Sequence, residues 1–158
     1  MDTATEQHAG GISMRIVIGS DHCGYTLKKE LMNFLKEHYE VTDCGCHSTD
    51  PVDFPDIAKQ VCRAIKEGRA ERGIMFCGTG VGAAIACNKV KGIRASVVHD
   101  VYSAHQCVEH DNCQVMAVGA QIIGDKVAMD LIRTFTEAKF LPDEEFHRRV
   151  EKLESMND

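Results

Sequence analysis

The chain has 158 residues, of which 44% are hydrophobic, so it has the size of one ordinary domain and can bury a core without disulfide bonds. Its net charge of −6 argues against a surface built to bind nucleic acid or an anionic membrane, because either task needs a clustered basic face. We therefore expect the partner to be a small molecule, with no nucleic acid and no membrane involved.

Residues 1–13, MDTATEQHAGGIS, lack the basic start and the apolar stretch of a signal peptide. We expect them to form a flexible N-terminal tail or to be a leftover of expression cloning, ahead of a single domain over residues 14–158. Without an export signal, the eight cysteines indicate a reducing, cytoplasmic location rather than disulfide bonds. No run of about 18 apolar residues occurs, so we expect no membrane span.

Short β-branched runs alternate with segments of helical apolar spacing from residue 15 onward. This alternation is typical of a parallel sheet with crossover helices, and it predicts a three-layer α/β/α sandwich with a Rossmann-like five-stranded sheet. Helical spacing is clearest around residues 27–35, 57–65 and 125–138, and a last helix follows Pro142. The predicted strands cover residues 15–19, 40–43, 73–77, 94–98 and 114–118.

Ligands of such sheets bind at the carboxyl ends of the strands. This rule selects the segments that follow four of the predicted strands. They are GSDHCG at 19–24, CGTGVG at 77–82, VHDVYS at 98–103 and VGAQIIG at 118–124.

The glycine-rich segment allows a first interpretation as a dinucleotide fingerprint. Residues 78–83 satisfy G-x-G-x-x-G/A after a strand, and Asp100 follows about 20 residues later. This pattern would make the protein a non-catalytic nucleotide-binding module. However, the fingerprint normally follows the first strand of its fold, whereas this segment follows the third, and no Gly-Lys-Ser/Thr of a phosphate loop is present.

A second interpretation makes the same segment an oxyanion cradle with a base attached. The small residues Gly78, Gly80 and Gly82 let backbone N–H groups converge at a helix N-terminus, where developing negative charge is stabilised. Cys77 lies just ahead of this positive end, which is expected to lower the pKa of its thiol toward neutrality. A base beside an anion cradle suits proton abstraction next to a carbonyl, as in sugar isomerisation through an enediolate.

A cyclic sugar must open before it has a carbonyl group, and a carboxylate and an imidazole across the hemiacetal can open it. Asp21, His22 and His110 are the candidates for this task. The alternatives are a turn residue at His22, a cap at Asp21 and a surface residue at a helix end for His110.

The segment Cys44–His47, CGCH, holds three possible metal ligands in four residues. The two C-x-x-C pairs of a structural zinc site are absent, so we predict no metal and no cofactor.

Taken together, several separated motifs resemble ribose-5-phosphate isomerase B and the galactose-6-phosphate isomerase subunits. The similarity extends from about Met14 to Leu153. The matching segments are GSDHCGYTLK, VDFPDIA, CGTGVG, ACNKVKGIRA, YSA and RRVEK.

The resemblance implies an aldose–ketose isomerase that uses no metal and forms a homodimer or homotetramer with active sites shared between subunits. By position, Cys77 matches the base that moves the proton between C1 and C2, and Thr79 helps the loop amides to hold the enediolate. Asp21 and His110 match the ring-opening pair, with His110 supplied by the partner subunit. His22 matches a substrate-binding residue, and Asn88 matches a position that shapes the loop.

The chain also departs from the family pattern at positions near the substrate phosphate. Relatives carry arginines where this chain has Gln121 and Glu145, and only Arg149 stands at its expected place. Each lost charge-assisted hydrogen bond typically costs about 1.5 to 3 kcal/mol. Arg148, His147 and Lys152 are candidate replacements, although a solvated helix face explains Arg148 and Lys152 as well.

A further departure is Asp111, which replaces the usual asparagine and is expected to alter hydroxyl recognition. The sequence thus favours isomerisation of ribose 5-phosphate to ribulose 5-phosphate. It leaves open another sugar, whether a tetrose phosphate, a hexose phosphate or an unphosphorylated sugar, and it leaves open the nucleotide-binding module.

Overall fold

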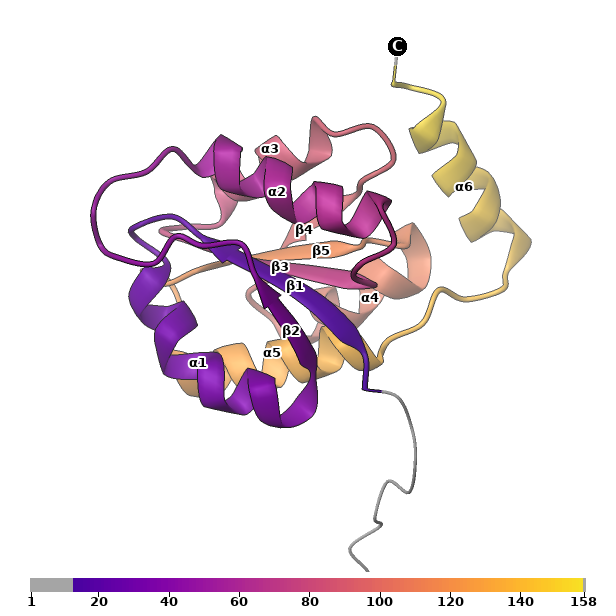
Figure 1. Ribbon diagram of the computed structural model, residues 1–158. Helices are drawn as coiled ribbons and strands as arrows, with labels where there is room; N and C mark the ends of the chain where they lie inside the picture. The colour runs from indigo at the N-terminus through magenta and orange to yellow at the C-terminus, as the bar shows by residue number, and fades with distance from the viewer. Residues whose placement is uncertain (1–12, 158) are drawn as a thin grey trace, which may run out of the picture.

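The computed structural model describes residues 13–157, in which five strands form one parallel sheet (Figure 1). The strand order is β2-β1-β3-β5-β4, so β3 lies at the centre and β2 and β4 form the edges. The strands are β1 (Arg15–Ser20), β2 (Glu40–Asp43), β3 (Arg72–Cys77), β4 (Ala95–Val97) and β5 (Val115–Gly119). Each predicted strand is confirmed to within about one residue at either end.

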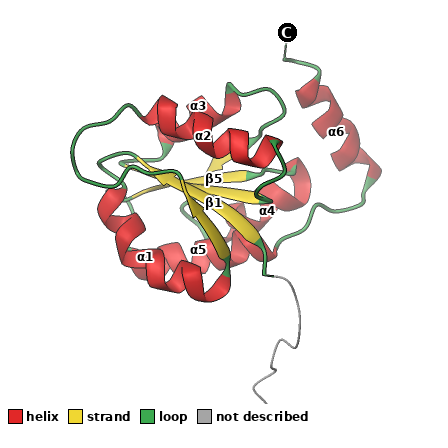
Figure 2. Cartoon of the chain, in the orientation of Figure 1, coloured by secondary structure: helices red, strands yellow, loops and turns green. Residues whose placement is uncertain are grey.

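Five of the six helices within these residues cover the two faces of the sheet, as the red and yellow layers of Figure 2 show. On one face lie α1 (Tyr25–His38), α4 (Val101–Asp111) and α5 (Asp125–Glu137), and on the other lie α2 (Phe54–Lys66) and α3 (Val81–Asn88). This arrangement confirms the predicted α/β/α sandwich.

The core consists of two apolar clusters, one on each face of the sheet. β1, β3 and β5 read as almost continuous apolar runs because both of their faces are covered by helices. Ile74 and Phe76 of β3 face α1, α4 and α5, whereas Met75 and Cys77 face α2 and α3. The central strand therefore ends with Cys77 pointing to the side of the sheet on which α3 begins.

The last helix, α6 (Glu144–Glu154), stands beside the sandwich and next to α4 (Figure 1). Within the described part of the chain, Val150 is the one buried residue of this helix. Charged residues occupy most of its other positions, so few apolar contacts hold this helix in place.

The tail predicted at residues 1–13 lies outside the described residues except for Ser13. Among the helices of residues 13–157, none has the length and the apolar character that a transmembrane helix requires.

Candidate active site

The predicted base and one predicted ring-opening residue lie side by side at the carboxyl edge of the sheet. Asp21 follows β1 directly, Cys77 ends β3, and these strands are hydrogen-bonded neighbours. The Cys77 Sγ donates to Asp21 Oδ2 at 3.4 Å. Both side chains are almost fully buried, at 7% and 6% exposure, so they interact where water screens charges poorly.

Backbone contacts fix the Asp21 carboxylate in this position. Its Oδ1 accepts a hydrogen bond from Gly24 N at 2.9 Å, and its own N–H donates to the Phe76 carbonyl at 3.2 Å. A methyl group at Gly24 would lie 2.0 Å from the Phe76 carbonyl oxygen, so only glycine allows this approach. The start of α1 is thereby held against the end of β3.

The glycine loop encloses the Cys77 sulfur from the other side. Gly80 is the N-cap of α3 and has φ of 82°, a conformation that side chains disfavour. The backbone N–H groups of Gly80 and Gly78 donate to the thiol sulfur and stabilise its charged form. Thr79 is exposed, and its Oγ1 accepts from Val81 N at 3.3 Å, while Gly82 lies against the ring of Phe54.

The predicted lowering of the Cys77 pKa is wrong. Burial is the largest influence and raises the pKa of this thiol, and the negative charge of Asp21 raises it further. The N–H groups of Gly80 and Gly78 oppose this rise and do not overcome it. In the resting site Cys77 is thus a neutral thiol whose proton points at Asp21, the nearest group that can take it.

His22 and Gln121 border this cluster. His22 is half-buried, and its Nδ1 accepts from Val52 N at 3.2 Å, which leaves Nε2 as the nitrogen that can donate to a ligand. The backbone N–H of Gln121 donates to the Gly78 carbonyl at 3.0 Å. Its side-chain Oε1 lies 3.3 Å from where a Gly78 methyl group would be, so a neutral amide stands beside the loop.

His110 and Asp111 lie at the opposite edge of the sheet from Cys77. They end α4, which leads into the start of β5, whereas Cys77 is level with Gly119 at the end of β5. Five residues of strand span about 16 Å, too far for one substrate carbon to meet both groups. Within one chain the structure therefore does not bring His110 to Cys77 and Asp21.

The His110 ring is nevertheless held in a defined orientation. Gln106 Nε2 donates to its Nδ1 at 3.0 Å, so the proton of the neutral ring lies on Nε2. Phe146 of α6 stacks on the ring, with centroids 4.1 Å apart and an interplanar angle of 15°. An oriented Nε2–H is what a proton donor to a sugar oxygen needs.

Arg149 also lies on α6, on an exposed face of that helix. It makes no hydrogen bond or ion pair with any residue between 13 and 157. Its neighbour Arg148 pairs with Glu144 at 2.6 Å, one helical turn earlier, as a solvated helix face predicts. Glu145 is exposed as well, and its carboxylate is negative at a position where the family resemblance predicts an arginine.

Two side chains near the site were missed from the sequence. His99 accepts from Gly119 N through Nε2 at 2.8 Å, and burial lowers its pKa, which favours the neutral ring that can accept. Lys28 is 1% exposed and donates to Asp43 at 2.9 Å and to the Cys46 carbonyl at 2.6 Å. His99 lies in the singled-out segment VHDVYS, whereas no sequence signal reveals a buried lysine.

Asn88 supports the edge strand rather than the loop itself. Its amide donates to the Ala95 carbonyl at 2.9 Å and accepts from Ala95 N at 2.8 Å. The side chain therefore pairs with β4 as a neighbouring strand would, and it covers polar groups that an edge strand otherwise leaves open.

The dinucleotide interpretation fits this geometry poorly. β5 lies between β3, which carries the glycine loop, and β4, which precedes Asp100. The Asp100 carboxylate caps α4 by accepting from Ser103 N at 2.7 Å, and this hydrogen bond lowers its pKa. An acidic residue that binds a ribose is expected on a strand next to the glycine loop.

The side chains of the CGCH segment are dispersed. Cys46 is buried and donates to the Ser48 carbonyl at 3.2 Å, while His47 is exposed. Across residues 13–157, no three His, Cys, Asp or Glu side chains are grouped so that they could hold a metal ion.

Comparison with known proteins gives consistent matches over most of the chain. A family model described as Ribose/Galactose Isomerase matches residues 16–153. Ribose-5-P isomerase B of Listeria innocua is 41% identical over 80% of this chain and 86% of its own length. D-erythrulose-4-phosphate isomerase of Pectobacterium atrosepticum is 40% identical over 80% of this chain and 85% of its own length.

A solved structure extends this likeness to the fold. Ribose-5-phosphate isomerase B of Clostridium thermocellum superposes with a TM-score of 0.87 at 43% identity. The alignment covers 90% of this chain and 97% of that chain.

Proposed function

The chain belongs to the ribose/galactose isomerase family of sugar-phosphate isomerases, and from this premise we propose that it interconverts ribose 5-phosphate and ribulose 5-phosphate through a cis-enediolate. The observation that carries this proposal is the buried contact between the Cys77 thiol and the Asp21 carboxylate, 3.4 Å apart at the mouth of the glycine loop.

Proton transfer by Cys77 is the central step of the proposed mechanism. Its thiolate removes the proton from C2 of the open-chain aldose, and the electron pair moves to the carbonyl oxygen to form the enediolate. The N–H groups at the start of α3, with the Thr79 hydroxyl, stabilise the negative charge on oxygen. The same sulfur then returns the proton to C1, while the O2 proton moves to O1.

Ring opening precedes this step when the sugar is cyclic. Asp21 accepts the proton of the O1 hydroxyl, and a partner subunit's His110, with both ring nitrogens protonated for this step, donates the Nε2 proton to the ring oxygen and becomes a neutral imidazole. The C1–O bond of the ring breaks as the C1 carbonyl forms. A protonated Asp21 no longer carries the charge that raises the pKa of Cys77. Opening the ring therefore makes the thiol easier to ionise. Because Asp21 is already protonated at this stage, the thiol proton passes to solvent water before the next step.

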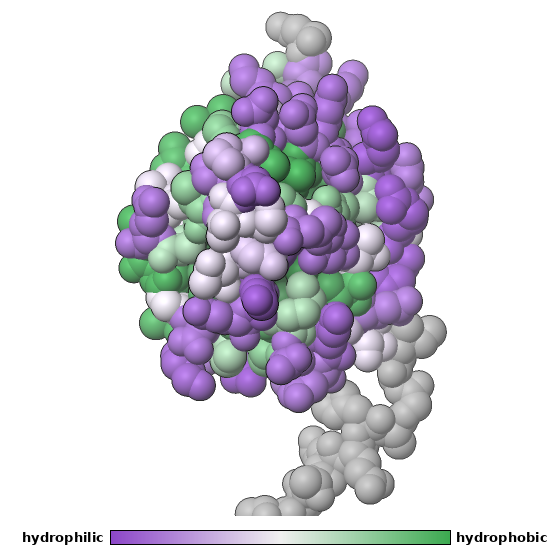
Figure 3. Space-filling model, turned by 60° about the vertical axis from the view of Figure 1, so that its left-hand side comes forward, coloured by the Kyte–Doolittle hydropathy of each residue, from purple (hydrophilic) through white to green (hydrophobic). Residues whose placement is uncertain are grey.

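A homodimer or homotetramer with shared sites supplies the residues that one chain cannot bring together. Apolar side chains are more than half exposed next to the edge at which β3, β4 and β5 end. They are Val81, Ile85, Val101, Tyr102 and Ile122. Figure 3 brings forward the side on which the strands end, and green apolar surface gathers along one side of that view. A second copy that covers this surface can present His110, Asp111 and Arg149 to the site.

A different sugar phosphate is the second candidate, because the phosphate end of the site has lost positive charge. Gln121 stands beside Gly78 as a neutral amide and Glu145 is acidic, which leaves His22 and a partner's Arg149 as the groups that favour a phosphate. A tetrose phosphate is shorter than a pentose phosphate, so its phosphate group would lie closer to the loop N–H groups. D-erythrulose 4-phosphate is the test compound for this alternative.

The decisive experiment is a substrate panel for the purified protein. Isomerase rates are measured with ribose 5-phosphate, D-erythrulose 4-phosphate, a hexose 6-phosphate and free ribose, with Cys77→Ala as the inactive reference. We expect the highest Cys77-dependent kcat/KM with ribose 5-phosphate. A higher value with erythrulose 4-phosphate would replace the proposed substrate, and no turnover of any sugar would reject the isomerase.

A further inference from the structure

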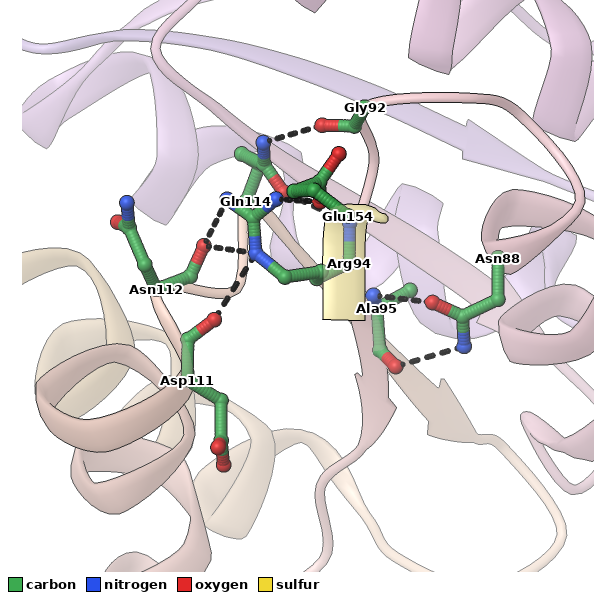
Figure 4. Close-up of polar contacts among 8 residues, drawn as sticks. All are labelled: Asn88, Gly92, Arg94, Ala95, Asp111, Asn112, Gln114 and Glu154. Carbon is green, nitrogen blue, oxygen red and sulfur yellow. Dashed lines mark hydrogen bonds and ion pairs between the residues drawn. The ribbon is translucent and has the colours of Figure 1, made fainter. Parts of the chain in front are cut away.

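Arg94 links three separate elements at the edge of the sheet opposite Cys77. It directly precedes β4, and its side chain is 14% exposed (Figure 4). Its Nε donates to the Asp111 carbonyl at 2.9 Å and its Nη2 to the Asn112 carbonyl at 2.9 Å. Its Nη1 forms an ion pair with Glu154, the last residue of α6. One guanidinium thus joins the start of β4, the end of α4 and the end of α6.

The contact with α4 provides hydrogen-bond donors for the carbonyl groups at the end of this helix. The last carbonyl groups of a helix have no partner inside it, and they carry the negative end of the helix dipole. α4 ends with Asn112 in a left-handed conformation, at φ of 50°, which turns these carbonyls toward Arg94. The planar fork of arginine can bind several of them at once, which the single ammonium of lysine cannot do in the same way.

Arg94 is itself held rigidly by Gln114. The Gln114 Oε1 accepts from Arg94 N at 2.8 Å, and its Nε2 donates to the Gly92 carbonyl at 2.8 Å. Figure 4 shows this side chain between Gly92 and Arg94, bonded to the backbone of both. A fixed backbone gives the guanidinium a defined origin, so it can act as a spacer of fixed length between α4 and α6.

α6 has few other attachments to the rest of the protein. Val150 is its one buried side chain, Phe146 stacks on His110, and the preceding Leu141 N donates to the Glu109 carbonyl at 3.0 Å. The Phe146 stack fixes the first half of the helix, and the ion pair of Glu154 fixes its end. Both attachments lead to the last turn of α4, which carries His110.

We propose that Arg94 is a positioning residue that joins the end of α4 and α6 into one rigid arm, so that His110 and Arg149 enter a partner's active site in a fixed relation. The inference rests on the proposed function, since it gives these two residues their task. Arg94 itself touches no reacting atom. It acts through the two helices that it connects.

Glu154→Gln is the sharpest test, because it removes the charge and keeps the shape of the side chain. The end of α6 then loosens, and Arg149 meets the substrate phosphate less often. We expect KM for the sugar phosphate to rise about 3- to 10-fold with kcat within about 2-fold, in the range of a partly buried ion pair. Glu151→Gln on the same helix is the matched control, because Glu151 is exposed and pairs with no other residue of the described chain.

Arg94→Lys tests the contact with α4 separately from the contact with α6. It keeps a positive charge for Glu154 but loses the fork that binds the α4 carbonyls. We therefore expect it to lower kcat on a cyclic substrate as well, through His110. A merely structural role would lower the melting temperature without this split between KM and kcat.

A readout that does not depend on activity completes the test. Amide hydrogen exchange over residues 144–154 should be faster in Glu154→Gln than in the wild type and in Glu151→Gln. Unchanged hydrogen exchange together with an unchanged KM in Glu154→Gln would overturn the proposal that Arg94 and Glu154 fix α6. Faster exchange with unchanged KM in both Glu154→Gln and Arg149→Ala would also overturn the inference, because the arm would then serve no site. If Arg149→Ala alone raises KM, the proposed site stands and the arm fails. If the wild type isomerises no sugar, the proposed function fails first and this inference falls with it.

Discussion

The reacting cluster and the α4–α6 arm are built by different means. Around Cys77 and Asp21 the chain itself makes the contacts, since backbone N–H groups of Gly24, Gly78 and Gly80 hold the two reactive side chains. The arm depends on side chains, with the Phe146 stack and the Arg94–Glu154 ion pair at its ends. The contrast teaches that the proton-transfer groups are held mainly by backbone contacts, whereas the arm that reaches the substrate is held mainly by contacts between side chains.

Removal of the Cys77 thiol should lower kcat more than any other change, because it deletes the proton carrier of the reacting cluster. We expect Cys77→Ala to lower kcat about 10²- to 10⁴-fold with an unchanged circular dichroism spectrum. The control is Cys44→Ala, which removes a thiol at the same edge of the sheet but outside the cluster. Near wild-type turnover of Cys77→Ala would show that another group carries the proton.

Loss of the imidazole tests the contribution of the arm to the chemistry. We expect His110→Asn to lower kcat on ribose 5-phosphate about 10²-fold, since this sugar is mainly cyclic. Erythrulose 4-phosphate cannot close a ring through its phosphorylated O4, so its turnover should fall much less.

The two substrates together separate chemistry from packing. His110→Asn also loses the stack on Phe146, but that loss should lower the turnover of both substrates to the same extent. His47→Asn, which changes an exposed histidine, serves as the control. Equal losses on both substrates would remove His110 from ring opening and leave it a structural residue of the arm.

Positive charge returned to the phosphate end should have a moderate effect. Gln121→Arg places a guanidinium beside Gly78, and one charge-assisted hydrogen bond of about 1.5 kcal/mol corresponds to a roughly 10-fold lower KM for ribose 5-phosphate. Gln60→Arg adds the same charge on the exposed face of α2. A similar fall of KM in both variants would mean that net charge, not a local contact, attracts the substrate.

Most of the reacting cluster around Cys77 and Asp21 was predictable from the sequence, whereas most contacts of the α4–α6 arm were not. β-branched runs revealed the strands, and the rule that ligands bind at the carboxyl edge brought Asp21 and Cys77 together. The Arg94 contacts depend on which side chains meet after folding, and no spacing along the chain encodes them. The pKa of Cys77 is raised, whereas the sequence predicted that it is lowered. The sequence shows the helix N-terminus, but it does not show the burial of the thiol, and burial has the larger influence.

The smallest expected effect is a shift of the pH profile of kcat/KM when the Asp21 charge is removed. This shift tests whether the Asp21 charge raises the pKa of the Cys77 thiol. The base acts as a thiolate, so kcat/KM rises with pH as the thiol ionises. Because burial and the Asp21 charge raise the pKa of Cys77, this rise should lie above the pH range of an ordinary thiol. Asp21→Asn removes one of these causes and keeps an oxygen for Gly24 N, so the rise should move to lower pH.

Erythrulose 4-phosphate is again the suitable substrate, since the loss of ring opening in Asp21→Asn then does not obscure the profile. Asp56→Asn, which neutralises an exposed carboxylate at the start of α2, should leave the rise in place. A shift to higher pH, or none, would mean that the Asp21 charge does not govern the thiol. Burial and the loop N–H groups would then set the pKa of Cys77, and the reacting cluster would need no charged partner for proton transfer.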